Sequence, residues 1–220
     1  MNSKFIDEFR SKINLSTEQK EIIVGLMLGD GCLETQNRGR TYRLKIEQTL
    51  LHKDYVDWLY GKLQNLVLTG PREKNKRIGE KTYCNYGFQT ISCGSLRFFA
   101  HQFYDQGSKK KKIPKIIKKL LSPLALAVWF MDDGLMDDGQ IKSKKHKALM
   151  INSQCFSRKD LGLLQKVLLK NFQIETTLKK DKQGFRIYLL SKTIQNFLAV
   201  IHSYVIPSMG YKIGRINTFA

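Results

Sequence analysis

The chain has 220 residues, of which 42% are hydrophobic and 26% are charged, a composition typical of folded globular proteins and not of disordered ones. Lysine and arginine number 38 against 19 aspartate and glutamate residues, so the formal net charge is +19. Solubility does not require such an excess. It therefore predicts a polyanionic partner, with nucleic acid favoured over an acidic membrane surface.

Other classes of protein are disfavoured by the same sequence. Ser122 and Pro123 interrupt the longest apolar run, which is shorter than the roughly 20 residues of a membrane helix. The charged N-terminus lacks the apolar segment of a secretion signal, which predicts a reducing compartment. The cysteines show no Cys-x-x-Cys spacing, so we expect buried thiols and neither a zinc site nor a disulfide framework; they are Cys32, Cys84, Cys93 and Cys155.

Self-comparison indicates a tandem duplication. Ile23–Gly31 reads IVGLMLGDG and Leu126–Gly134 reads LAVWFMDDG, which pairs Asp30 with Asp133. Three more matches follow in the same order, among them Ile113-Pro114 with Ile206-Pro207. The interpretation is two halves, residues 1–107 and 108–220, with a lysine-rich linker near 108–121.

In the first half, Ser16 and Gln19 have the spacing of a capping box and predict a helix that ends at Asp30-Gly31. Residues 42–47 alternate between apolar and charged side chains, which predicts a strand with one core face and one charged face. The remaining expected elements are helices over 54–66 and 95–104 and a strand over 81–92.

In the second half, Ser122-Pro123 predicts the start of the second apolar helix, which again ends at Asp-Gly. Glycine is expected there because it tolerates the backbone conformations that terminate a helix. Helices over 159–172 and 192–204, strands over 174–180 and 185–191, and a hairpin turn at 181–184 complete this half. Each half thus reads helix, strand pair, helix, strand pair, helix, which predicts an α+β fold.

The two Asp-Gly ends carry the predicted chemistry. If the apolar helices pack along small residues such as Gly25 and Ala127, Asp30 and Asp133 come together. Like charges this close repel unless a divalent cation neutralises them, and hard oxygen ligands select Mg²⁺ or a similar metal. Metal between two acids suits phosphodiester hydrolysis. A merely structural turn acid is the alternative, but a carboxylate is electrostatically unfavourable at a helix C-terminus.

Further acids surround the second motif. Asp132 precedes Asp133, and a second Met-Asp-Asp-Gly follows at Met136–Gly139. The repeat pairs only Asp133 with Asp30. Asp137 and Asp138 are therefore interpreted as turn formers.

With the motif twice in a lysine-rich chain, the sequence resembles the single-chain, two-motif LAGLIDADG homing endonucleases of mobile introns, most closely the mitochondrial group I branch. The resemblance covers nearly the whole chain and implies two pseudo-symmetric αββαββα halves, saddle-shaped antiparallel DNA-binding sheets and a central pair of motif helices. The chain departs from the motif at Val128, where the family has glycine, and at Leu28 and Met131, where it has an acid. These positions concern helix packing.

The resemblance also implies roles for further residues. Backbone carbonyls of Gly29 and Asp132 would join Asp30 and Asp133 in binding Mg²⁺ or Mn²⁺, with Ca²⁺ as a non-catalytic substitute. Lysines near the site would stabilise developing charge, and glutamines would line it; the candidates are Lys212, Lys111 or equally Lys112, Gln48 and Gln154. A phosphate-contacting charge run or an ordinary strand-end amide is an equally good interpretation of any one of them.

Double-stranded DNA is the expected partner of the charged sheet faces, because β-ribbons can enter the major groove. Two halves would cover on the order of 20 base pairs of an asymmetric site. The candidate contacts are Arg38, Arg40, Arg43, Lys45, Arg72, Lys74, Lys76, Lys142, Lys144, Lys179, Lys180 and Arg186.

The sequence therefore predicts a monomeric, Mg²⁺-dependent endonuclease with no membrane partner. The excess of lysine over arginine suits an AT-rich organellar genome, so a mitochondrion or chloroplast is expected. One alternative is an intron maturase that binds intron RNA, which basic charge alone does not separate from a DNA-cutting enzyme. Another is a non-catalytic DNA-binding regulator, which would be expected to lose a motif acid. An intein is disfavoured because the duplicated halves fill the chain.

Overall fold

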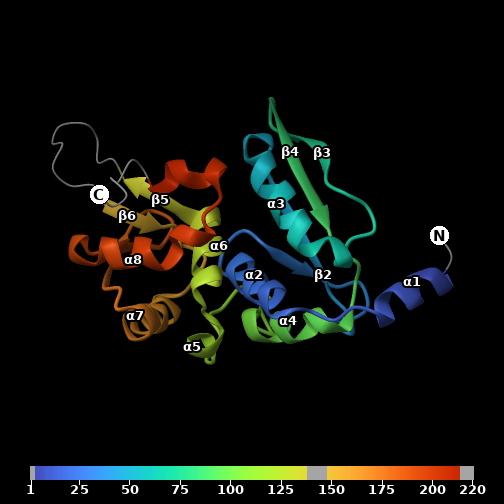
Figure 1. The fold of residues 1–220 in the computed structure, drawn as a ribbon, viewed down its shortest axis with the longest axis horizontal. Coiled ribbons are helices and arrows are strands. Elements are labelled where there is room, and N and C mark those ends of the chain that lie inside the picture. The colour runs from blue at the N-terminus through green and yellow to red at the C-terminus, as the bar shows by residue number, and fades with distance from the viewer. Residues whose placement is uncertain (1–2, 138–147, 214–220) are drawn as a thin grey trace.

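The computed structural model describes residues 3–137 and 148–213, which form two similar halves around a central helix pair (Figure 1). The first half contains helices α1 (Ser3–Ser11), α2 (Thr17–Leu28), α3 (Lys53–Leu63) and α4 (Arg97–Phe103) and strands β1 (Cys32–Glu34), β2 (Arg43–Thr49), β3 (Arg72–Ile78) and β4 (Lys81–Gln89). The second half contains helices α5 (Ile117–Leu120), α6 (Pro123–Asp133), α7 (Arg158–Phe172) and α8 (Ile194–Ile201) and strands β5 (Gly134–Asp137), β6 (Ala148–Ile151), β7 (Thr176–Lys180) and β8 (Phe185–Leu189).

Each half carries one four-stranded antiparallel sheet, and the two sheets have the same strand order. The first is ordered β1-β2-β4-β3 and the second β5-β6-β8-β7. In each sheet the outer hairpin, β3–β4 or β7–β8, pairs with the inner strands through its second strand, so that its first strand lies at the sheet edge. Each sheet follows directly on one motif helix, α2 or α6. The expected α+β class and the order helix, strand pair, helix, strand pair, helix are confirmed.

The motif helices begin where the caps predict. The Ser16 side chain accepts a hydrogen bond from the Gln19 backbone N–H, and the Gln19 side chain accepts one from the Ser16 backbone N–H, so the capping box is complete. Ser122 accepts from the Ala125 N–H, and Pro123 occupies the first turn of α6. These caps satisfy N–H groups that a helix start leaves unpaired.

The expected reason for the glycines at the helix ends is wrong. Gly31 and Gly134, the glycines of the two Asp-Gly pairs, both lie outside the left-handed region, and Gly134 has a φ of −72°. Gly134 is instead required by close packing, because a Cβ there would lie 2.2 Å from the Phe130 ring.

The core runs without interruption through both halves. Eight consecutive residues of α6, Leu124–Met131, are buried, and α2 buries its side chains from Ile22 to Leu28. The two helices pack directly on each other. At the contact, a Cβ on Gly25 would lie 2.6 Å from the Val128 Cβ. The valine that replaces the family's glycine in the second motif thus fills the space beside the glycine kept in the first.

Some expectations fail or lie beyond the described residues. Asp137 ends strand β5 rather than forming a turn, and Asp138 falls outside the described residues. Only Cys93 is a fully buried thiol, whereas Cys32 and Cys155 are exposed. Within residues 3–137 and 148–213, no helix is long and apolar enough to cross a membrane.

Candidate active site and nucleic-acid interface

The two motif acids lie where each motif helix ends and the first strand of its sheet begins. Asp133 is the last residue of α6 and directly precedes β5. Asp30 follows the end of α2 and lies two residues before β1. The Asp30 charge contributes to raising the pKa of Asp133, which places the two carboxylates within electrostatic reach of each other. The Asp30 N–H also bonds to the side chain of Asp132, the residue before Asp133, so the two acids lie at neighbouring ends of the packed helices.

Asp30 is exposed and is held by groups from both halves. Its Oδ2 accepts a hydrogen bond of 2.8 Å from the Gln48 side-chain amide, which lies on β2. Its backbone N–H donates to the Asp132 Oδ2 of α6 at 3.0 Å. Both the carboxylate and the peptide of Asp30 are thus fixed.

The acids of α6 are more enclosed. Burial and then the charge of Asp30 raise the pKa of Asp133 to about 8, and the same two causes raise the pKa of Asp132 to about 7. Neighbouring lysines counteract part of this shift. Such carboxylates favour a cation that would let them ionise at neutral pH.

Two lysines contact the motif ends in matching ways. The Lys111 ammonium donates to the Gly29 carbonyl at 2.5 Å, and the Lys212 ammonium donates to the Asp132 carbonyl at 2.8 Å and to that of Met131. Lys212 is only 6% exposed, and burial lowers its pKa while the three aspartates raise it. Lys112, the other candidate on spacing, lines a separate cleft beside Ile113 and Pro114.

The two candidate glutamines have different partners. Gln48 donates to Asp30, whereas Gln154 donates to the Asp181 carboxylate in the β7–β8 turn at 3.0 Å. The repeat pairs these residues by sequence, but of the two only Gln48 hydrogen-bonds to a motif acid. The turn itself forms as predicted, because Asp181 Oδ1 accepts the backbone N–H groups of Gln183 and Gly184.

Sequence reasoning missed a hydrogen-bonded chain behind Asp30. The His52 Nδ1 lies 3.3 Å from the Gln48 Oε1, and the His52 Nε2 lies 3.0 Å from the Tyr211 hydroxyl. Burial and then the Lys212 charge lower the pKa of His52. A neutral ring with its proton on Nδ1 donates to the Gln48 oxygen, which turns the Gln48 amide NH₂ toward Asp30. The only feature of the sequence that could have indicated this chain is the spacing of four residues between Gln48 and His52.

The residues at the helix ends fit a hard divalent cation. The carboxylates of Asp30, Asp132 and Asp133 gather with the ammonium groups of Lys111 and Lys212, and once all three carboxylates are ionised they exceed the ammonium groups by one charge. Among the described residues, no group of three or more His, Cys, Asp or Glu side chains has metal-binding geometry by itself. Backbone carbonyls and a substrate phosphate would have to complete the coordination.

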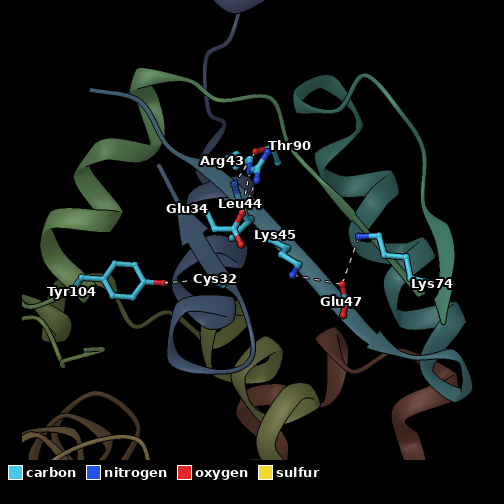
Figure 2. Close-up of polar contacts among 9 residues, drawn as sticks. All are labelled: Cys32, Glu34, Arg43, Leu44, Lys45, Glu47, Lys74, Thr90 and Tyr104. Atoms are coloured by element: carbon cyan, nitrogen blue, oxygen red, sulfur yellow. Dashed lines mark hydrogen bonds and ion pairs between the residues drawn. The ribbon is translucent and has the colours of Figure 1, made fainter. Parts of the chain in front are cut away.

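The exposed face of the first sheet carries basic side chains, some of which form ion pairs with acidic side chains on the same face. Leu44 and Ile46 face the core, so Lys45 and Glu47 alternate to the open face of β2. Figure 2 shows the Glu47 carboxylate between two lysines, with Lys45 at 3.7 Å and Lys74 of β3 at 3.6 Å. These ammonium groups are thereby aligned across two strands.

Other predicted contacts share this face. Arg43 pairs with Glu34 at 2.8 Å (Figure 2). A groove of about 290 Å³ runs along the same face; its basic lining residues are Arg10, Arg43, Arg72 and Lys74. Arg10, which the sequence did not indicate, reaches this groove from α1 and donates to the Ser92 carbonyl at 2.9 Å.

The remaining candidates are placed unequally. Lys179 and Arg186 are cross-strand partners on one face of the second sheet, and Arg186 pairs with Asp181 at 2.7 Å. Lys180 pairs with Phe185 and so alternates to the opposite face. The exposed residues Arg38, Arg40 and Lys76 lie in the β1–β2 loop or on β3, while Lys142 and Lys144 lie outside the described residues.

Comparison with known proteins agrees with this geometry. The LAGLIDADG DNA endonuclease family matches residues 20–197. DNA endonuclease I-ChuI of Chlamydomonas applanata is 32% identical over 93% of this chain and 98% of its own length. Cytochrome b mRNA maturase bI2 of Saccharomyces cerevisiae is also 32% identical, over 88% of this chain, which spans only 46% of that protein.

A solved structure of the homing endonuclease I-WcaI bound to its DNA recognition sequence superposes with a TM-score of 0.88 at 26% identity, covering 96% of this chain and 93% of that one. The family match covers most of the sequence and includes both Asp-Gly pairs. The chain therefore belongs to the LAGLIDADG DNA endonuclease family.

Proposed function

We propose that this protein is a metal-dependent endonuclease that makes a double-strand break in a long, asymmetric DNA site. The observation that carries the proposal is the delivery of two acids, Asp30 and Asp133, by paired helices to one cluster beneath two basic sheets. A non-catalytic regulator has no use for both acids and the lysines that contact their helix ends.

The residues of the cluster have distinct parts in this proposal. Asp30, Asp133 and the carbonyls of Gly29 and Asp132 would hold Mg²⁺ or a similar ion, which supplies a water nucleophile and stabilises charge on the leaving oxygen. Lys111 and Lys212 place positive charge beside these carbonyls. Gln48 keeps the Asp30 carboxylate in one orientation.

The sheets support a long and asymmetric target. The outer hairpin of the first sheet has strands of 7 and 9 residues, whereas the equivalent strands of the second sheet have 5 each. Unequal ribbons contact unequal lengths of groove, and together they would cover on the order of 20 base pairs. Because one chain supplies both acids, we also propose that it acts as a monomer. A mitochondrion or chloroplast is the proposed compartment.

Substitution of the acids tests the proposed activity. Asp30→Asn and Asp133→Asn should each lower the double-strand cleavage rate on the order of 10³-fold or more, while DNA binding stays within a few-fold. Asp160→Asn on α7 is the matched control and should cut normally. Full cleavage by the Asp30→Asn, Asp133→Asn double variant would refute the assignment.

Target and metal can be obtained in one experiment. Cleaved sites are selected from a randomised DNA library with Mg²⁺, and bound sites are selected separately with Ca²⁺. The proposal expects one long, non-palindromic site in both selections and cleavage only with Mg²⁺. Cleavage in the presence of excess chelator would contradict the metal requirement.

A second candidate function is RNA binding, which one surface favours. A cleft of about 670 Å³ is lined by residues of α4, of α7 and of the segment 112–115 between them. Figure 1 shows α4 and α7 on the same side of the molecule, at the bottom of the view. The charged lining of the cleft is almost wholly basic: His101, Lys112, Lys115, Arg158, Lys159 and Lys166 surround the single acid Asp160. Nearby, like-charge repulsion from Lys170 lowers the pKa of Lys118. Such crowding of positive charge fits a polyanion, and a similar protein is named as an mRNA maturase.

Charge reversal separates the two functions. Lys115→Glu with Lys166→Glu should weaken binding of structured RNA by about ten-fold or more, because two attractive charges become repulsive. DNA cleavage should be unchanged, since neither lysine lies on a sheet. Lys20→Glu, at an exposed position of α2, is the control. If RNA binding is unchanged in the double variant, the cleft does not bind RNA.

A further inference from the structure

The two motif ends differ at one position. Gly29 and Asp132 occupy the same place in the two copies, each directly before a motif acid. One is a residue without a side chain, and the other carries a carboxylate. The proposed function uses only the backbone carbonyls of these two residues, so the Asp132 side chain has no part in it.

The Asp132 carboxylate fills the space that a side chain at Gly29 would need. A Cβ on Gly29 would lie 2.4 Å from the Asp132 Oδ2 and 2.6 Å from the Asp132 Cβ. Atoms cannot approach so closely, so the two positions are complementary. Only one of them can carry a side chain pointing into this contact.

The same carboxylate completes the hydrogen bonding at the end of α2. The backbone N–H groups on either side of Asp30 bond within their own half, that of Gly29 to the Gly25 carbonyl at 3.0 Å and that of Gly31 to the Leu26 carbonyl at 2.8 Å. The Asp30 N–H between them instead donates to the Asp132 Oδ2 at 3.0 Å. The other half therefore supplies the partner of this peptide.

The reciprocal contact cannot exist, because Gly29 has no side chain to accept the Asp133 N–H. We propose that Asp132 is a positioning residue that fixes the Asp30 peptide across the helix pair, so that it assists cleavage of one DNA strand and not the other. The inference rests on the proposed endonuclease function. Fixing the peptide restricts the direction of the Asp30 side chain, and misplacement of a reacting group by about 1 Å costs on the order of 10²-fold in rate.

Strand-resolved kinetics test this role. Each strand of a target duplex is labelled separately, and single-turnover rates are measured for the full-length protein. Asp132→Ala should slow one strand by about ten-fold or more and the other by less than about three-fold, with nicked DNA accumulating. Gln48→Ala identifies the affected strand, because Gln48 contacts Asp30 directly. Asp132→Asn keeps an oxygen acceptor and should restore most of the rate.

A second pair of variants separates positioning from packing. Gly29→Ala should lower both Tm and cleavage, because its Cβ meets Asp132. Adding Asp132→Gly restores the space, so Tm should recover while cleavage of the Asp30 strand stays slow. A purely structural role predicts that rate and Tm recover together, and that outcome would overturn the inference. Asp160→Ala is the control for loss of a carboxylate.

Amide hydrogen exchange gives a result that does not depend on cleavage. In metal-free protein, the Asp30 amide should exchange about ten-fold faster in Asp132→Ala, while exchange at Gly31 changes little. If the wild-type protein cuts no DNA but this exchange rises, the proposed function fails and the contact stands. Unchanged exchange in Asp132→Ala, or equal slowing of both strands, overturns the positioning role.

Discussion

The Asp30 and Asp133 ends of the helix pair come from one repeated motif, yet their surroundings differ. Asp30 is exposed. Its carboxylate accepts a hydrogen bond from Gln48, and its backbone N–H donates one to Asp132. Asp133 is more enclosed, burial raises its pKa, and Gln154 donates to Asp181 instead. A duplicated sequence motif thus fixes where the acids lie but not how each one is held. That second property depends on residues that the two halves do not share.

The largest expected effect comes from replacing Lys111 and Lys212, the lysines that contact the two helix ends. Lys111→Met and Lys212→Met should each reduce cleavage by roughly 10²-fold, the order found when a charge-stabilising group is removed. Only Lys212→Met should also lower the free energy of unfolding, by about 1–3 kcal/mol, because two buried carbonyls lose their donor. Cleavage assays and chemical denaturation measure the two effects. Equal destabilisation by both variants would show that the ends are alike.

Replacement of Gln48 should affect the cleavage rate, whereas replacement of Gln154 should affect stability. Gln48→Ala should slow cleavage by about ten-fold, because the Asp30 carboxylate loses its orienting donor. Gln154→Ala should leave the rate within a few-fold and instead cost about 1 kcal/mol of stability by breaking the contact to Asp181. Single-turnover rates and thermal unfolding of both variants separate the outcomes. Loss of activity only in Gln154→Ala would reverse the assignment.

Stability of the metal-free protein should fall as pH rises. The folded pKa of Asp133 is about 8 and that of Asp132 about 7, whereas an unfolded aspartate titrates near 3.9. Between these values the folded state binds more protons than the unfolded state, so raising the pH favours unfolding. With chelator present, Tm should drop by about 4 °C or more between pH 5 and pH 8.

Asp133→Asn should flatten this pH dependence, and Asp160→Asn should not. Divalent cation should raise Tm more at pH 8 than at pH 5, because it competes with the protons. A wild-type Tm that rises over this pH range without metal would contradict the raised pKa values of Asp132 and Asp133.

The smallest expected effect concerns the first sheet. Glu47 pairs with Lys45 and Lys74 on the open face (Figure 2). Glu47→Gln removes one negative charge and frees two lysines, so non-specific DNA binding should tighten by about three-fold with a steeper salt dependence. Titrations at several salt concentrations measure this. Weaker binding would show that Glu47 is needed to align the lysines.

Much of the fold was predictable because its signals are local. The capping residues Ser16 and Ser122 and the apolar runs behind them indicate both motif helices, and alternation in β2 indicates its buried face. Strand β3 has the sequence REKNKRI, which lacks alternation and so gives no signal of a strand. Its pairing with β4 comes from tertiary context.

The site was less predictable. The repeat indicated Asp30 and Asp133, but the His52–Tyr211 contact joins residues far apart in the chain, and nothing in either local sequence indicates it. The same holds for the Asp132 side chain, whose partner is a backbone group of the other half. Pairings of this kind depend on how the two helices are aligned.

The Gly25–Val128 contact gives this helix pair a defined partner preference. If two copies of the first half met through α2, glycine would face glycine and leave a void. If two copies of the second half met through α6, valine would face valine and overlap. Neither half can therefore replace the other, and a chimera with a related chain must take both helices from one parent or restore the matching pair of residues.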